Sequence, residues 1–226
     1  DLSGWRPRRL IEYFIENTDF SKPGLHLLQL PTGYGKTSIF YSAAFPIVCG
    51  ENALSAIYVS PLRSLADDVY ARWIGIAQHI MSKRDIEDIA GLQHMASPGS
   101  VFLNKPVIFT TFDTMCLHAF KLPPAELHKI VRREACLKEH GSRGHYEVSR
   151  GVLGDSIVFL DEPHLAITST SLLKSLILLL KILLHTGSTI ILATASMPKE
   201  LPELMNNLIM EVSHKNFTGF RYGASS

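Results

Sequence analysis

Short apolar runs alternate with longer segments of helical periodicity along most of the chain. Within five of these runs apolar residues follow one another with little alternation, which is typical of strands buried on both faces of a sheet. The runs predict strands at residues 25–30, 56–60, 107–111, 157–160 and 189–193. Since strands that alternate with helices form parallel sheets, we expect an α/β fold with a mostly parallel sheet and helices on both faces.

The segments between these runs carry the helical pattern. Helices are predicted over residues 10–15, from about 37, over 64–80, over 169–185 and after 198. The longest apolar stretch, residues 172–184, is interrupted by three polar residues, Lys174, Ser175 and Lys181. A helix that spans a bilayer needs about 20 apolar residues. We therefore expect this stretch to pack against the sheet, and we expect no membrane partner.

Composition limits the size and the setting of the protein. The 226 residues are 46% hydrophobic, which is enough for one well-buried domain over residues 1–226. The net charge of +1 excludes a general attraction to nucleic acid, so any such binding needs a local surface. Three widely spaced cysteines have no metal-binding spacing, and this favours a reducing, cytoplasmic setting.

Residues 121–155 interrupt the alternation of strands and helices. They contain a Pro-Pro pair, four glycines and a charged helical stretch, and the seven basic residues of the whole segment are interleaved with acids. We interpret this segment as a charged insertion in the domain. Its surface could bind nucleic acid or a partner, or it could be a solvated helix and loop with no such role.

A glycine-rich loop follows the first predicted strand. Its sequence is Pro31-Thr32-Gly33-Tyr34-Gly35-Lys36-Thr37, and a predicted helix comes next. Backbone N–H groups and partial positive charge at such a helix start hold an anion. We expect residues 32–37 to bind the phosphates of ATP, with Lys36 at the β- and γ-phosphates and the Thr37 hydroxyl on Mg²⁺. Leu30 stands where the full phosphate-loop pattern begins with glycine, so a plain turn with an exposed lysine is the alternative.

A pair of acids follows the fourth predicted strand, in Ile157-Val158-Phe159-Leu160-Asp161-Glu162-Pro163-His164. A buried parallel strand brings such acids to the carboxyl edge of the sheet, where α/β proteins bind ligands. We expect Asp161 to hold Mg²⁺ opposite Thr37, and Glu162 to orient or deprotonate the attacking water. Lys36, Asp161 and Glu162 are thus the predicted catalytic residues. The alternative is that the two acids only cap the next segment.

Two more segments come directly after predicted strands, Ser60-Pro61-Leu62-Arg63-Ser64-Leu65-Ala66 and Thr194-Ala195-Ser196-Met197-Pro198. With the loop and the Asp-Glu-Pro-His box, their order over residues 25–198 resembles the first RecA-like domain of superfamily 2 helicases. Within that superfamily the chain looks most like the helicase part of the CRISPR-associated helicase–nuclease of type I interference systems. The pointers are Pro-Thr-Gly-Tyr-Gly-Lys-Thr, Asp-Glu-Pro-His, Ala-Thr-Ala-Ser-Met-Pro and a strand-end Thr-Thr-Phe-Asp at residues 110–113.

The resemblance implies a RecA-like P-loop domain that is half of an ATP-dependent translocase or helicase acting on single-stranded DNA. It implies that His164, Thr194 and Ser196 couple the state of the nucleotide to the grip on the strand. The other partners it implies are a second RecA-like domain of the same protein, a CRISPR surveillance complex and a nuclease. On the residues alone, His164 could equally be a hydrogen-bonded structural histidine.

The same resemblance implies that Arg63, Ser64 and Thr111 contact the single strand. Helix N-termini and hydroxyl groups hold phosphates without reading bases, so the residue types agree with this role. A solvated surface arginine is the alternative for Arg63.

The sequence departs from the family pattern in three respects. Upstream of the loop, where many relatives have a glutamine for adenine, this chain has Trp5, Arg6 and Arg8, any of which could stack on the base, although Trp5 could equally be a core residue. No His-Asp dipeptide of a metal nuclease occurs among the ten histidines. The second RecA-like domain, whose arginine finger is worth about 10³–10⁵ in rate, is not visible. The chain also opens without Met, so we expect a piece of a longer protein that binds nucleotide but hydrolyses it slowly.

Two other classes of function remain open from the sequence. One is a P-loop ATPase that remodels protein partners and never touches nucleic acid. The other is a nucleotide-gated binding module that recruits partners through residues 121–155.

Overall fold

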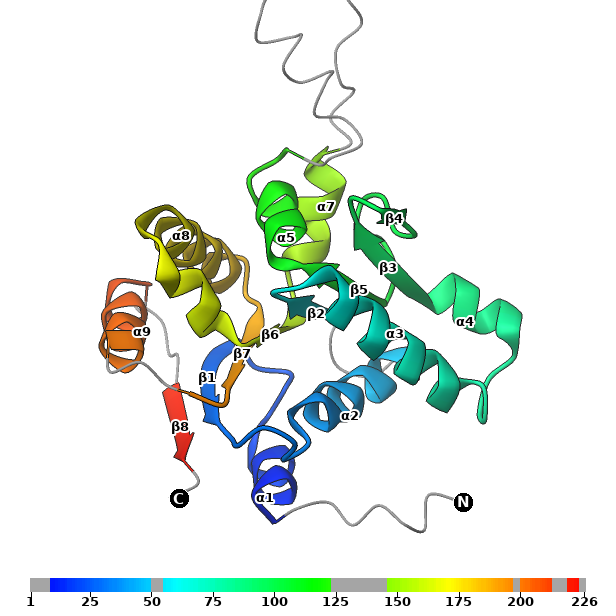
Figure 1. The fold of residues 1–226 in the computed structure, drawn as a ribbon, viewed down its shortest axis with the longest axis horizontal. Helices are drawn as coiled ribbons and strands as arrows, with labels where there is room; N and C mark the ends of the chain where they lie inside the picture. The colour runs from blue at the N-terminus through cyan, green and yellow to red at the C-terminus, as the bar shows by residue number, and fades with distance from the viewer. Residues whose placement is uncertain (1–8, 50–54, 123–145, 197–199, 213–218, 224–226) are drawn as a thin grey trace, which may run out of the picture.

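A computed structural model describes residues 9–49, 55–122, 146–196, 200–212 and 219–223. Its strands are β1 (Gly24–Gln29), β2 (Ser55–Ser60), β3 (Ala90–His94), β4 (Ser97–Pro98), β5 (Val107–Thr111), β6 (Ser156–Asp161), β7 (Thr189–Thr194) and β8 (Gly219–Gly223). They form one sheet in the order β4-β3-β5-β2-β6-β7-β1-β8 (Figure 1). Every described pair of neighbouring strands is parallel except β3 with β4. The predicted mostly parallel sheet is confirmed.

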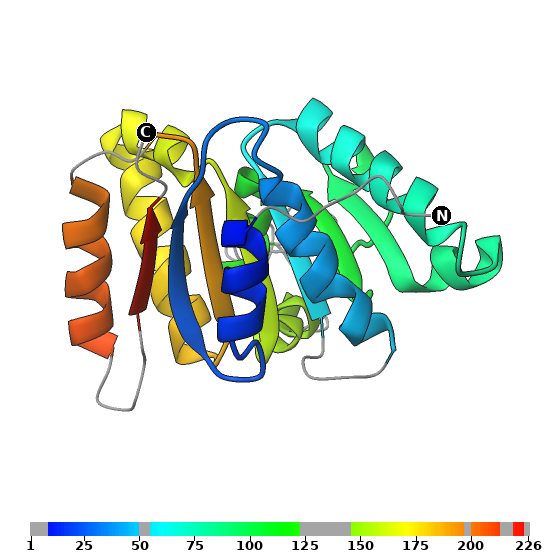
Figure 2. The same cartoon turned by 90° about the horizontal axis from the view of Figure 1, so that it is seen from below.

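Helices cover both faces of this sheet (Figure 2). They are α1 (Arg9–Asn17), α2 (Lys36–Val48), α3 (Arg63–Ala77), α4 (Lys83–Ile89), α5 (Phe112–Ala119), α7 (Tyr146–Leu153), α8 (Thr170–His185) and α9 (Glu200–Val212). The first four supply apolar side chains to the core on one face, and the last four supply the core on the other. Among the described residues, no helix combines the length and the apolar character needed to cross a bilayer.

The strands are buried on both faces because successive side chains point to opposite cores. In β6, Phe159 packs in the core under α2, whereas Val158 and Leu160 pack in the core under α8. Phe40 of α2 lies edge-on to Tyr58, with the two ring centroids 5.3 Å apart. This packing holds the carboxyl ends of β1, β2 and β6 in fixed relation, and the residues of the predicted site follow those ends.

Several elements were not predicted from the sequence. Helix α5 starts at Phe112 directly after β5, so no turn residue marks its beginning. Strand β3 contains Gly91 and no β-branched residue, and it lies near the edge of the sheet, where the apolar signal is weak. Helix α4, strand β4 and strand β8 are also short elements outside the predicted series.

The predicted charged insertion at 121–155 lies partly outside the described residues, which omit 123–145. Its described end is α7, which packs on α5. The Lys121 ammonium lies 2.6 Å from the Glu147 carboxylate, and the His118 ring lies 2.9 Å from the Ser149 hydroxyl. A role for the insertion in binding stays a prediction.

Candidate active site

The glycine-rich loop connects β1 to α2 and has the backbone shape that its glycines permit. Gly33 has φ of 73° and Gly35 has φ of 98°, both in the left-handed region that other residues rarely adopt. The Tyr34 N–H donates to the Pro31 carbonyl at 3.1 Å and closes the turn. Gly35 then caps α2, so the first N–H groups of this helix lie at the end of the loop.

The loop lysine and the second acid form an ion pair across the sheet edge. The Lys36 Nζ lies 2.7 Å from Glu162 Oε1, and the two side chains are only 10% and 20% exposed. Lys36 comes from the start of α2 and Glu162 from the end of β6, which β7 separates from β1. The parallel topology therefore brings together two predicted catalytic residues that are 126 positions apart.

Glu162 accepts hydrogen bonds from several directions. The Thr194 hydroxyl lies 3.0 Å from Oε2, the Ala195 N–H donates to the same oxygen at 3.0 Å, and the His164 Nδ1 lies 3.2 Å away. Burial raises the pKa of Glu162, but the hydrogen bonds from Lys36, Ala195 and Thr194 outweigh it and hold the pKa below its ordinary value. The carboxylate is therefore ionised and held in place.

The backbone of Glu162 is strained. Its φ of 49° and ψ of 51° place a non-glycine residue in the left-handed region, at a cost of about 1–3 kcal/mol. Strain of this kind persists only where the surrounding contacts impose it, and it is found at functional sites. Here the strained residue is the one that the sequence analysis named as the base.

Thr194 connects Glu162 to the other predicted coupling residues. Its hydroxyl oxygen lies 2.9 Å from His164 Nδ1 and 2.5 Å from the Ser196 carbonyl. The hydroxyl has one hydrogen, so it donates either to the Glu162 carboxylate or to the Ser196 carbonyl. Thr194 thus has two alternative hydrogen-bond states.

Asp161 has one satisfied and one unsatisfied oxygen. The Tyr58 hydroxyl donates to Oδ2 at 2.6 Å, whereas the buried Oδ1 has no hydrogen-bond partner within the described residues. Burial raises the pKa of Asp161, and the bond from Tyr58 acts in the opposite direction. An unpartnered buried carboxylate oxygen suits a hard cation, which takes oxygen ligands.

Thr37 and Tyr58 complete the surroundings of Asp161. Burial and then the charge of Asp161 raise the pKa of the Tyr58 phenol, while a hydrogen bond with Thr37 lowers it in part. Thr37 and Asp161, the two predicted Mg²⁺ ligands, line the same groove, and oxygen atoms are the ligands that Mg²⁺ takes. Tyr58 was not predicted from the sequence, although a tyrosine within a strand as apolar as β2 was a usable signal.

The loop opens into a groove of about 1270 Å³ between α2 and α3. Thr32, Gly33, Gly35, Lys36 and Thr37 line it together with both acids, whereas Tyr34 does not. The groove is also lined by three residues that were not predicted from the sequence, Phe45, Arg72 and His79. The predicted base-stacking residues Trp5, Arg6 and Arg8 lie outside the described residues.

The three predicted strand-binding residues, Arg63, Ser64 and Thr111, line a second cavity of about 370 Å³. The Arg63 guanidinium lies 3.7 Å from the sulfur of Met95, a residue that is 73% exposed. Thr111 is buried, and its hydroxyl bonds to that of Thr114 at 3.0 Å. This cavity shares no lining residue with the nucleotide groove.

The described residues contain no cluster of three or more His, Cys, Asp or Glu side chains that could hold a metal ion. A cation at Asp161 and Thr37 would therefore need ligands from a bound phosphate and water. This is how Mg²⁺ is commonly held in nucleotide sites.

Comparison with known proteins gives a family and a fold. Residues 9–204 match the family model of the DEAD/DEAH box helicases. Among solved structures, the chain is similar to Cas3 of T. fusca in a structure with ATP, with a TM-score of 0.64 and 17% identity. It is also similar to S. cerevisiae Dbp5 bound to Gle1 and IP6, with a TM-score of 0.58 and 18% identity. A search of curated protein sequences gives no match.

These similarities cover nearly all of this chain but only part of the others. The alignment with Cas3 covers 98% of this chain, and the alignment with Dbp5 covers 96% of it. It spans 24% of that Cas3 chain and 48% of that Dbp5 chain. At such low identity the likeness shows a shared fold.

Proposed function

Because the chain belongs to the DEAD/DEAH box helicase family, we propose that it is the nucleotide-binding half of an ATP-driven motor that moves along single-stranded DNA. The observation that carries this proposal is the line of contacts from Lys36 through Glu162 to Thr194. These contacts join the phosphate loop to the acid that would activate water and to the segment that would relay the nucleotide state. A loop that only binds phosphate needs neither the acid nor the relay segment.

In the proposed reaction, the N–H groups of residues 33–37 and the Lys36 ammonium hold the phosphates of ATP. Thr37 and Asp161 would hold Mg²⁺, which supplies neutralisation of the phosphate charge when bound. Lys36 must leave Glu162 to reach the phosphates. The carboxylate then loses its strongest donor, so its pKa rises and it becomes a better acceptor for the proton of the attacking water.

The relay would use the two hydrogen-bond states of Thr194. When the hydroxyl donates to Glu162, the Ser196 carbonyl is released from this donor; when it donates to the Ser196 carbonyl, Glu162 is released from it. A change at the nucleotide can therefore alter the hydrogen bonding of Ser196 without moving the sheet.

The strand would lie at the second cavity, with its phosphates at Arg63 and Ser64. We propose single-stranded DNA, a second RecA-like domain, a CRISPR surveillance complex and a nuclease as partners, on the motifs shared with the type I interference helicase. The fold likeness to Cas3 supports this choice. A Dbp5 structure bound to RNA and ADP BeF3 is similar as well, with a TM-score of 0.55, so RNA is the competing substrate.

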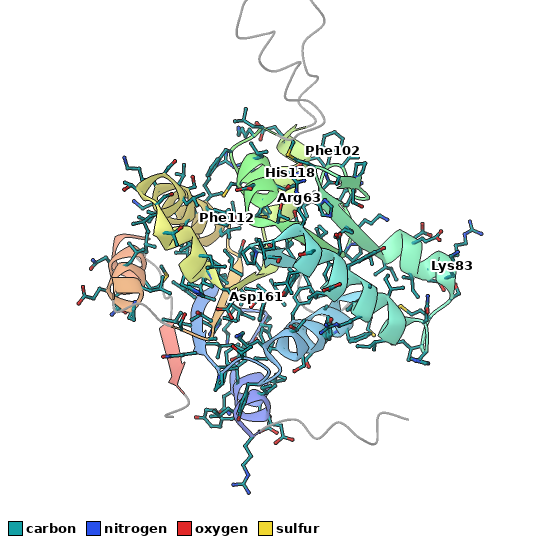
Figure 3. The ribbon with its side chains drawn as sticks, viewed as in Figure 1. Arg63, Lys83, Phe102, Phe112, His118 and Asp161 are labelled. Atoms are coloured by element: carbon teal, nitrogen blue, oxygen red, sulfur yellow. The ribbon has the colours of Figure 1, made fainter. Side chains whose placement is uncertain are left out.

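The test is the ATPase rate of the full-length protein with single-stranded DNA, duplex DNA, RNA or no nucleic acid. Lys36→Ala supplies the background, because we expect its loss to remove nucleotide binding without unfolding the domain. Lys83→Ala is the matched control: Lys83 is 86% exposed and lies at the start of α4, away from the site (Figure 3). An ATPase rate with single-stranded DNA that exceeds the rates with duplex DNA, with RNA and without nucleic acid supports the proposed motor function.

The other outcomes separate the alternatives. A rate unmoved by any nucleic acid favours a protein-remodelling ATPase. Loss of a partner on deletion of residues 123–145, with turnover unchanged, favours the binding module. Fast Lys36-dependent turnover by residues 1–226 alone would contradict the need for a second RecA-like domain.

A further inference from the structure

The two acids of the nucleotide groove have four carboxylate oxygens, and three of them accept hydrogen bonds. The Lys36 ammonium donates to Glu162 Oε1 at 2.7 Å, and the Ala195 N–H donates to Oε2 at 3.0 Å. The Tyr58 hydroxyl donates to Asp161 Oδ2 at 2.6 Å. Asp161 Oδ1 is the oxygen that has no hydrogen-bond partner within the described residues. The acids therefore leave one carboxylate oxygen for a cation.

Tyr58, the donor to Asp161, is held firmly by its neighbours. Its side chain is fully buried, and its ring stacks on that of Phe159, its partner in the register of β2 with β6. The two ring centroids are 5.6 Å apart and the planes differ by 14°. Phe40 of α2 lies edge-on to the same ring. Because buried side chains in such packing keep one rotamer, the phenol hydroxyl has a fixed place, and it fixes Oδ2 and the orientation of the carboxylate.

The number and the rigidity of oxygen ligands distinguish Mg²⁺ from Ca²⁺. Mg²⁺ is small, needs a near-ideal octahedron, keeps several waters and takes one or two carboxylates beside substrate phosphates. Ca²⁺ takes about six to eight oxygens in a flexible arrangement, and these can include both oxygens of one carboxylate. A carboxylate that is fixed and offers one oxygen therefore suits Mg²⁺ and gives little to Ca²⁺. The absence of a three-residue metal cluster among the described residues agrees with this.

We propose that Tyr58 is a positioning residue that makes the nucleotide site select Mg²⁺ over Ca²⁺, because it holds one oxygen of Asp161 and leaves the other for the cation. The proposal rests on the proposed function, since it needs Asp161 at the cation that accompanies ATP. Without the phenol hydroxyl, Oδ2 has no donor to hold it, and both oxygens of Asp161 can turn toward one ion. The site would then accept the larger cation that takes two.

The first test measures the affinity of the full-length protein for a labelled non-hydrolysable ATP analogue with Mg²⁺, with Ca²⁺ and with EDTA. The wild type should bind more tightly with Mg²⁺ than with Ca²⁺. Tyr58→Phe should lower the ratio of these two affinities by about 10–100-fold, the range for groups that orient a metal ligand. A general loss of packing would lower both affinities together and leave their ratio unchanged. The affinity in EDTA should stay the same, which shows that the phosphate loop is intact.

Two further comparisons show whether the hydroxyl acts through Asp161. Tyr41→Phe is the matched control, because the buried Tyr41 lines the same groove but donates to the Val69 carbonyl at 3.1 Å, and it should keep the ratio. The second comparison adds Tyr58→Phe to Asp161→Ala. When the carboxylate is gone, loss of the hydroxyl should not change the ratio further, because coupled residues are not additive.

The outcomes separate this proposal from the function on which it rests. If Tyr58→Phe leaves the ratio unchanged, or lowers it as much in the Asp161→Ala protein as in the wild type, the selective role of Tyr58 is wrong and the motor stands. The same holds if the wild type binds the analogue equally well with either cation. If the wild type binds no nucleotide under any of these conditions, the proposed function fails together with the role of Tyr58.

Discussion

The phosphate loop with its two acids (the nucleotide end) and the cavity of Arg63 where we propose that the strand binds (the strand end) both follow the carboxyl ends of strands, but their side chains are partnered very differently. At the nucleotide end, Lys36, Glu162 and Thr194 are bound to one another at 2.7 to 3.0 Å. At the strand end, the described contact of the Arg63 guanidinium is with the sulfur of Met95, at 3.7 Å. Sulfur is a weak acceptor, so Arg63 remains available to a stronger one.

The difference shows what each end must do on binding. The nucleotide has to replace an internal ion pair, because removing one partner from a partly buried pair leaves an uncompensated charge. In the proposed reaction, phosphate oxygens would replace Glu162 as the partner of Lys36, and Glu162 would then be released. A strand bound at Arg63 would displace no ion pair of the described residues, so we expect its affinity to depend on charge and on salt.

The largest expected effect tests whether Glu162, the acid of the ion pair at the nucleotide end, is the catalytic base. Glu162→Gln should lower the rate of ATP hydrolysis by the full-length protein by about 10²–10⁴-fold, because an amide cannot take a proton from water. Nucleotide binding should remain, since the loop and Lys36 are intact. Turnover rates and nucleotide affinity are measured together. Persistent turnover would assign the base to another residue.

The next effect tests the unpartnered oxygen of Asp161. Tyr58→Phe removes the hydroxyl that bonds to Asp161 Oδ2, and it should weaken the Mg²⁺ dependence of nucleotide binding by about 10–100-fold, as for other groups that orient a metal ligand. The readout is a Mg²⁺ titration of nucleotide binding. Tyr41→Phe is the control, because the Tyr41 hydroxyl also lies at the groove but bonds to the Val69 carbonyl. Equal effects of the two variants would remove Asp161 from the metal site.

A smaller effect tests the open strand end. Arg63→Ala should reduce the slope of log affinity against log salt by about 0.7 to 1, which is the contribution of one phosphate contact. Affinity for a single strand is measured across a series of salt concentrations. Arg84→Ala, at an exposed position in α4, should leave the slope unchanged. An unchanged slope for Arg63→Ala would make it a solvated surface arginine.

The smallest effect concerns the stability that the internal pairing gives to the nucleotide-free protein. The pKa of Glu162 is held below its ordinary value of 4.5, so the carboxylate contributes stability above that pH and loses it as the pH falls through the lowered pKa. The free energy of unfolding should therefore fall more steeply below pH 4.5 in the wild type than in Glu162→Gln. Urea unfolding from pH 7 to 3 measures it, with exposed Glu12→Gln as control. Parallel curves for wild type and Glu162→Gln would contradict the pairing.

Much of the fold could be predicted because buried parallel strands are apolar on both faces. The runs at residues 157–160 and 189–193 became β6 and β7 with ends shifted by one residue at most. Helix α5 could not be predicted, because it starts at Phe112 with no loop after β5. Tyr58 was also missed, since its partner Asp161 is 103 positions away and only the pairing of β2 with β6 brings them together.

The family and the chemical identity of the groups at the sheet edge could be predicted from the amino-acid sequence, because glycines before a lysine and acids after an apolar strand have specific local roles. How these groups are partnered follows from the tertiary structure. The ion pair of Lys36 with Glu162 and the unpartnered oxygen of Asp161 depend on which strands are neighbours. Local patterns set backbone shape and residue type, whereas distances between remote side chains follow from strand order and packing.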